Sequence, residues 1–161
     1  MNFLKFKVRK IFYIPIIVAL LILYSAAAIS PNFDVKHVYG VLPAFIYYND
    51  NLLTGEEGGV SKGPFVFAAE DLKDDPVLIT HELVHVKQSY RYLFFQWVPA
   101  YFSQDKLVQF ECEAYATEIK RKEAIPVYAR FIRDEYGPSV PLYKVELYLI
   151  YYWEKLQCSS N

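Results

Sequence analysis

The residues best suited to chemistry in this chain lie in the segment 81–85, which reads His-Glu-Leu-Val-His, an H-E-x-x-H motif. In a helix, residues i and i+4 lie one above the other on the same face, so the imidazoles of His81 and His85 can reach one metal ion. Glu82 would then stand beside the metal, where a carboxylate can polarise a metal-bound water. The motif predicts a zinc site with Glu82 as general base.

The segment around the motif has the pattern of a buried helix. Asp75 followed by Pro76 is a start signal, because Asp caps helix N-termini and Pro is favoured in the first turn. On a helical wheel the two histidines share one sector with apolar residues such as Val77 and Leu78. A second apolar sector lies roughly opposite and contains Ile79, Leu83, Val86 and Tyr90. Two apolar sectors indicate burial, and buried histidines need partners such as a metal.

A third protein ligand must be a carboxylate, because no histidine follows His85. A second helix, expected over about residues 105–123, offers Glu111 and Glu113. Glu111 falls inside the apolar arc of that helix, whereas Glu113 falls among polar residues. A buried carboxylate is costly unless it is paired or binds a metal, so we expect Glu111 to bind zinc and Glu113 to face solvent. A buried salt bridge from Glu111 to Arg or Lys is the alternative.

The segment 81–85 followed by Glu111-x-x-Ala114 resembles the gluzincin pattern, in which a Glu on a second helix completes a two-His, one-Glu zinc site. Gln88, three residues after the second histidine, makes the chain similar to small, poorly characterised metallopeptidases of bacteria and phages. The resemblance covers about residues 64–120 and implies peptide-bond hydrolysis by a zinc-activated water. Many gluzincins carry Asp at the position of Tyr115, where it supports a zinc-bound histidine. Another residue must provide that support here.

Peptide hydrolysis also needs a donor, besides the metal, for the developing oxyanion. Four side chains are candidates for this role or for supporting the site: Tyr90, Tyr92, Tyr115 and His37. We slightly favour Tyr92, because it shares the histidine sector of the site helix.

The N-terminus predicts contact with a membrane. Four basic residues within positions 5–10 precede an uncharged stretch, Ile11 to Ser30, that is long enough to span a bilayer. The positive-inside rule then places the tail in the cytoplasm and the rest outside it. We expect a tail and transmembrane anchor over 1–30 and a metallopeptidase-like domain over 31–161. A signal peptide cleaved near the small residues 25–28 is the alternative.

We expect an α+β, mostly helical fold for the domain, with short antiparallel strands packed on the two site helices. Val35 to Tyr48 has strand composition, and Gly63 to Ala68 reads as a strand just before the site helix. In zinc peptidases a strand in this place often pairs with the substrate backbone, and a core strand without substrate contact is the alternative. Two aromatic, nearly uncharged segments, 92–102 and 148–153, are expected to form helical core rather than a face at the membrane interface.

Two further patterns bear on partners. The formal net charge of −1 becomes about −5 without the four basic N-terminal residues (−1 − 4), so nucleic-acid binding, which needs a basic stripe, is not expected. Cys112 and Cys158 could form a disulfide in an oxidising compartment, but we favour a buried thiol at Cys112.

The sequence therefore predicts a membrane-anchored zinc metallopeptidase acting on peptide or protein substrates. The alternative is a non-catalytic, membrane-tethered structural or binding protein of the cell envelope that zinc stabilises.

Overall fold

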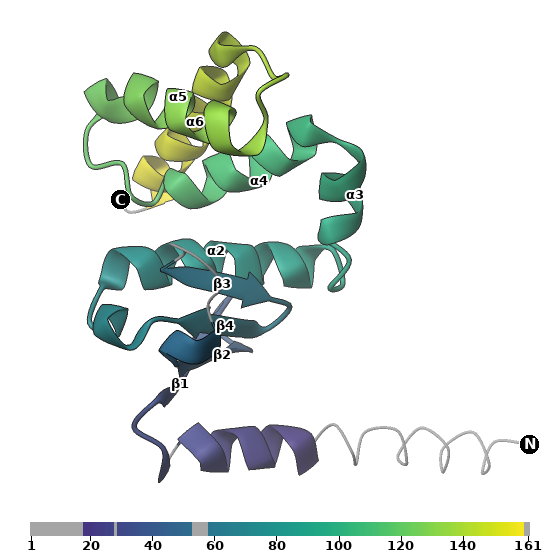
Figure 1. Cartoon of the computed structure of the whole chain (residues 1–161), viewed down its shortest axis with the longest axis vertical. Helices are drawn as coiled ribbons and strands as arrows, with labels where there is room; N and C mark the ends of the chain where they lie inside the picture. Colours follow the sequence, from purple (N-terminus) through teal and green to yellow (C-terminus); the bar gives the residue numbers. More distant parts are fainter. Residues whose placement is uncertain (1–17, 28, 53–57, 160–161) are drawn as a thin grey trace, which may run out of the picture.

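The computed structural model of the chain describes residues 18–27, 29–52 and 58–159. The fold is α+β and mostly helical, as predicted, with a four-stranded sheet. Figure 1 shows the sheet, then helix α2 (Pro76–Arg91), then the remaining helices of the C-terminal half as successive layers. Helix α2 therefore lies between the sheet and the other helices.

The sheet has the strand order β1-β2-β4-β3. Its strands are β1 (Phe33–Val38), β2 (Leu42–Tyr48), β3 (Gly59–Lys62) and β4 (Phe65–Ala68). The outer pairs are antiparallel, but the central pair β2 and β4 is parallel, so the prediction of purely antiparallel strands is wrong. Parallel pairs are favoured where strands are fully buried, and the facing residues Ile46 and Val66 of this pair are both buried.

The predicted strand over 63–68 corresponds to β4, which pairs with β2 on one side and with β3 on the other. Its backbone is thus fully engaged within the sheet, and the core-strand alternative holds. The sheet has two edge strands, β1 and β3, and β3 is the one that packs more extensively against α2.

Helix α2 begins as its sequence predicts. The Asp75 carboxylate caps it by accepting the backbone N–H of Val77 at 2.8 Å and of Leu78 at 3.3 Å. The remaining helices are α3 (Trp97–Phe102), α4 (Gln104–Tyr115), α5 (Ile125–Tyr136) and α6 (Leu142–Ser159), and the 3-10 turns are η1 (Asp50–Leu52), η2 (Glu70–Leu72) and η3 (Lys122–Ala124). Helix α4 ends earlier than predicted, and the Thr117 hydroxyl donates to the Ala114 carbonyl at 2.7 Å just past this end.

Two separate hydrophobic clusters hold the fold together. The first lies between the sheet and α2 and includes Ile46, Val66 and Val86. The second lies among α4, α5 and α6 and includes Val108, Ile132 and Leu149. Helices α2 and α4 pack on each other, one from each cluster. The two helices that carry the predicted ligands therefore belong to different cores.

No helix in the described ranges is long and apolar enough to cross a membrane. This finding contradicts the predicted transmembrane anchor and the predicted localisation as a single-pass membrane protein. The basic tail and residues 11–17, which also belong to the alternative signal peptide, lie outside the described residues.

The two aromatic segments differ in burial. In α6, the rings of Tyr148, Tyr152 and Trp153 pack against the second cluster, as predicted. In the segment 92–102, most large apolar side chains are exposed, Leu93 by 74% and Phe102 by 79%. The prediction of a helical core is wrong for this segment, because α3 is short and packs mainly against one neighbour, α4.

Both cysteines carry free thiols, so the structure contains no disulfide between them. Cys112 is buried in the second cluster, where its thiol faces the Val145 carbonyl, and burial raises its pKa. Cys158 is exposed near the end of α6. The favoured prediction, a buried thiol at Cys112, is therefore confirmed.

Candidate metal site

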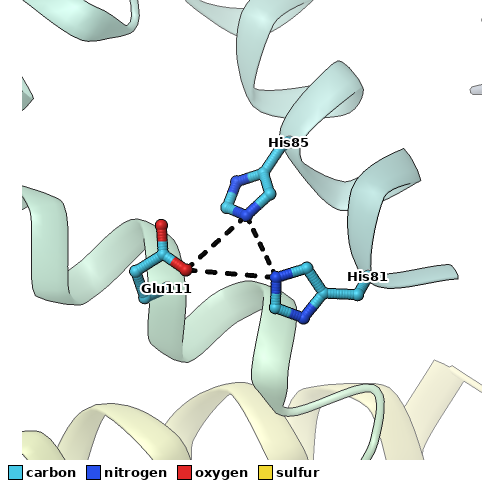
Figure 2. A group of neighbouring side chains, drawn as sticks. All are labelled: His81, His85 and Glu111. Carbon is cyan, nitrogen blue, oxygen red and sulfur yellow. Dashed lines mark hydrogen bonds and ion pairs between the residues drawn. The ribbon is translucent and has the colours of Figure 1, made fainter. Parts of the chain in front are cut away.

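Helices α2 and α4 bring three potential ligand atoms together (Figure 2). His81 Nε2 and His85 Nε2 are 3.2 Å apart, because the two residues are one helical turn apart. Glu111 Oε2, from α4, lies 3.6 Å from His85 Nε2 and 4.0 Å from His81 Nε2. All three side chains are largely buried. The cluster could hold a metal ion.

A carboxylate outside the motif orients His81. Glu118, just beyond the end of α4, lies 2.7 Å from His81 Nδ1 and accepts its N–H, which leaves Nε2 directed at the other ligands. Burial lowers the pKa of His81, but the Glu118 hydrogen bond and the nearby Glu82 carboxylate raise it more, so the net pKa is raised. Glu118 fills the supporting role that the sequence analysis left without a residue.

Gln88 orients the second histidine. Its Oε1 lies 3.0 Å from His85 Nδ1, and its Nε2 donates to the Phe110 carbonyl at 3.0 Å and to Glu113 Oε2 at 3.1 Å. Because these two acceptors fix the orientation of the Gln88 amide, His85 carries its proton on Nδ1 and turns the Nε2 lone pair toward the ligand cluster. Burial lowers the pKa of His85 and so favours the neutral, ligating form.

The prediction that Glu113 faces solvent is wrong. Arg91 from α2 binds it with two nitrogen–oxygen contacts of 3.0 and 2.8 Å, and the Glu113 side chain is only 15% exposed. The helical wheel of α4 placed it on a polar face, but that face is covered by α2 through Arg91 and Gln88. Glu113 thus joins the two helices behind the cluster rather than contributing a ligand.

Glu111 has the opposite environment. Its ion-pair contacts in the described structure are to the two histidines, not to Arg or Lys as the alternative proposed. Burial raises the pKa of Glu111 to about 7, since no permanent positive charge stabilises the carboxylate. A divalent cation would supply that charge.

Glu82 lies beside the cluster and is only 5% exposed. Its Oε2 atom is buried and has no hydrogen-bond partner among the described residues. Burial raises the pKa of Glu82. Strand β3 approaches closely here, since a Cβ added at Gly59 would lie 3.3 Å from Glu82 Cγ. Gly59 therefore lets the edge strand pass directly over the carboxylate.

A cavity of about 260 Å³ opens beside these groups. Its walls include β3 residues 59–61, the cluster and Glu82, together with Gln96 from the α2–α3 loop and Tyr136 from α5. A second cavity of about 690 Å³ shares Glu82 and Tyr136 and so continues the first. The larger cavity of about 810 Å³ at the start of α2 contains none of the predicted site residues.

Of the four predicted supporting residues, only Tyr115 lies at the site. Its ring packs edge-on against His81 with centroids 4.5 Å apart, and its hydroxyl is 3.4 Å from that of Tyr136. Burial raises the pKa of both phenols.

The other three predicted residues are elsewhere. Tyr92 packs on Phe110 and is absent from both site cavities. Tyr90 turns to the sheet and donates to the Pro43 carbonyl at 2.7 Å. His37, on β1, is 3.0 Å from the Tyr24 hydroxyl. Tyr136, which the sequence analysis missed, is the phenol that lines the cavity beside the cluster.

Some missed residues had a signal in the sequence. Glu118 follows Glu111 by seven residues, which is two turns along the same helical face. Gln88 follows His85 by three residues, within reach on α2. Gln96 and Tyr136 had none, because only the packing of a loop and of α5 brings them to the site.

No protein-family model, curated protein or solved structure matches this chain. The resemblance to gluzincins thus rests on the two motifs and on the arrangement of their side chains.

Proposed function

We propose that this chain is a zinc-dependent metallopeptidase of the gluzincin type. In this proposal His81, His85 and Glu111 bind the zinc, and Glu82 is the general base. The observation that carries it is a buried ligand cluster beside a buried carboxylate, Glu82, which has an unpaired oxygen and lines the same cavity as the cluster.

The ligand spacing supports zinc. In a tetrahedral site with bonds of about 2.0–2.1 Å, neighbouring ligand atoms are ~3.3 Å apart. The three observed separations of 3.2, 3.6 and 4.0 Å approach this value. Two histidines and one carboxylate are also a common ligand set of catalytic zinc, which keeps a further position open. A zinc ion held here would supply Lewis acidity, making water a nucleophile near neutral pH.

The environment of Glu82 supports proton transfer. A general base works best when its pKa is close to the working pH, and burial moves the pKa of Glu82 upward from its ordinary value. In the proposed reaction, Glu82 takes a proton from the attacking water at its unpaired Oε2. It then delivers this proton to the leaving amine nitrogen. The Tyr136 phenol lines the same cavity and is positioned to donate to the developing oxyanion.

The edge strand supports a peptide substrate. β3 pairs with β4 on one side only, and its residues 59–61 line the cavity beside Glu82. An extended peptide can add to such an edge through backbone hydrogen bonds. This mode recognises the peptide backbone, while the side chains of the substrate remain to be selected by the cavity walls.

A purely structural zinc site is the second candidate. It is favoured by the position of the cluster between two hydrophobic cores, where an ion would join them. It does not account for Glu82, whose Oε2 atom is buried with no hydrogen-bond partner among the described residues, an arrangement that costs free energy and that a structural site does not need.

The Glu82→Gln variant separates the two functions. It keeps the size of the side chain but cannot accept the proton, so zinc content should stay at the wild-type level while hydrolysis of casein or a peptide library falls at least about a hundredfold. Glu123→Gln, an exposed site on η3, is the matched control and should keep full activity. A zinc-loaded wild-type protein without any peptidase activity would support the structural site instead.

A further inference from the structure

The loop between α2 and α3 has an inverted pattern of burial. The apolar residues Phe95, in the loop, and Trp97, the first residue of α3, are 62% and 61% exposed, whereas the polar Gln96 between them turns its side chain inward. Gln96 Oε1 is buried, and Gln96 is one of the residues that line the cavity beside the metal cluster. Solvation alone would favour the reverse arrangement, with Gln96 outside and the aromatic rings inside.

The backbone of the loop enforces this arrangement. Leu93 and Phe94 both have positive φ angles, 50° and 68°, a conformation that large L-residues rarely adopt. The Phe94 N–H binds the Ser89 carbonyl at 2.7 Å and thereby closes the end of α2. The chain then turns back so that Gln96 faces the cavity before α3 begins. A costly conformation of this kind is typical of positions where a side chain must be held in place for function.

Gln96 Oε1 is also an acceptor without a donor. Three buried side-chain oxygens in the described structure lack a hydrogen-bond partner, and two of them, Glu82 Oε2 and Gln96 Oε1, belong to residues that line the same cavity. In the proposed mechanism Glu82 Oε2 accepts a hydrogen bond from the attacking water. Gln96 Oε1 requires an N–H or O–H donor that the described residues do not provide.

We propose that Gln96 is a substrate-positioning residue, whose side-chain carbonyl accepts a hydrogen bond from a backbone N–H of a bound peptide. This inference rests on the proposed function and specifies its substrate class as chains with secondary amides. Residues 59–61 of β3 line the same cavity, so a peptide lying there would be bound by the edge strand and by Gln96. Gln96 does not take part in the chemical step.

Binding of metal-directed probes tests this role without any turnover. Acetohydroxamate tests the metal alone. N-acetyl-dialanine hydroxamate adds a peptide backbone, and a set of its analogues replaces one backbone N–H at a time by N–CH3. Each probe is titrated calorimetrically into zinc-loaded wild type, Gln96→Met and Gln157→Met. The last variant makes the same change at an exposed position near the end of α6.

We expect one N-methylated analogue to bind wild type about tenfold more weakly than its parent, the cost of an unpaired polar group. Gln96→Met should bind the parent about tenfold more weakly and show no further loss with that analogue, because the same hydrogen bond is already absent. Acetohydroxamate affinity and zinc content should stay unchanged in Gln96→Met, which shows that the variant is folded. Gln157→Met should match wild type for every probe.

Equal losses on N-methylation in wild type and Gln96→Met would overturn the role of Gln96. So would a wild type that binds the dialanine hydroxamate no more tightly than acetohydroxamate. Failure of the proposed function would be seen differently. The protein would then bind the peptide hydroxamates through Gln96 but hydrolyse no peptide. A second readout applies to an active enzyme, in which Gln96→Met should raise KM about tenfold and leave kcat within about twofold.

Discussion

The contact between Glu118 and His81 gives the most direct test of how the site is organised. The Glu118 carboxylate accepts the His81 Nδ1–H at 2.7 Å, and its side chain is only 19% exposed. Hydrogen bonds to a charged group of this kind contribute about 1.5–3 kcal/mol. Since about 1.4 kcal/mol is a factor of ten in affinity, Glu118→Ala should weaken zinc binding about ten- to a hundredfold.

Glu118→Gln keeps an acceptor of the same length but removes the charge, so its affinity should fall between those of wild type and Glu118→Ala. Zinc affinity is measured by competition with a chromophoric chelator at neutral pH. The control is Glu123→Gln, which removes an exposed carboxylate nearby in the sequence and should bind zinc like wild type. Wild-type zinc affinity in Glu118→Ala would refute the argument that this carboxylate orients the ligand, and an equal loss in Glu123→Gln would point to a general effect of charge.

Three further outcomes follow from the site. Glu111→Ala should lose stoichiometric zinc, which metal analysis measures. Glu113→Ala should keep its zinc but melt at a lower temperature, because Glu113 binds Arg91. Loss of zinc in Glu113→Ala with retention in Glu111→Ala would contradict this assignment. Burial raises the pKa of Glu111 from 4.5 to about 7. Between pH 4.5 and about pH 7, the native metal-free protein therefore keeps a proton on Glu111 that the unfolded chain has lost. The free energy of unfolding of the metal-free protein, measured by urea titration in the presence of a chelator, should therefore fall as pH rises. The slope of this free energy against pH should be smaller in Glu111→Gln, and equal slopes in the two proteins would exclude the effect. Gly59→Ala should lower peptidase turnover without loss of zinc, because the new Cβ would lie 3.3 Å from Glu82 Cγ, and unchanged kinetics would show that the strand can yield.

Local chemistry explains which parts of the site could be predicted. The start of α2 depends on Asp75 and Pro76 alone, and the spacing of the histidines follows from helical geometry. The burial of Glu111 could be read from the apolar residues around it on one helix. Glu113 could not be read in this way, because its partner Arg91 is 22 residues away in the sequence and belongs to another helix.

The remaining features depend on long-range packing. Which strand reaches the edge of the sheet is decided by the pairing of β2 with β4, and no short pattern specifies that pairing. Tyr136 reaches the site only because α5 folds back across α4. The anchor was inferred from the length of an uncharged stretch that follows four basic residues, and such a stretch does not show where a helix begins or ends.

The division of the hydrophobic core into two clusters has a consequence for folding cooperativity. The histidines belong to the sheet side and Glu111 to the helical side, so a metal ion held by all three would bond across the boundary between two potential folding units. With the ion bound, neither unit can open without breaking a coordinate bond, and the domain behaves as one. Without it, the described residues join the two halves by side-chain packing and by polar contacts such as those of Gln88, Glu113 and Glu118. Metal occupancy would then decide whether this chain unfolds as one body or as two.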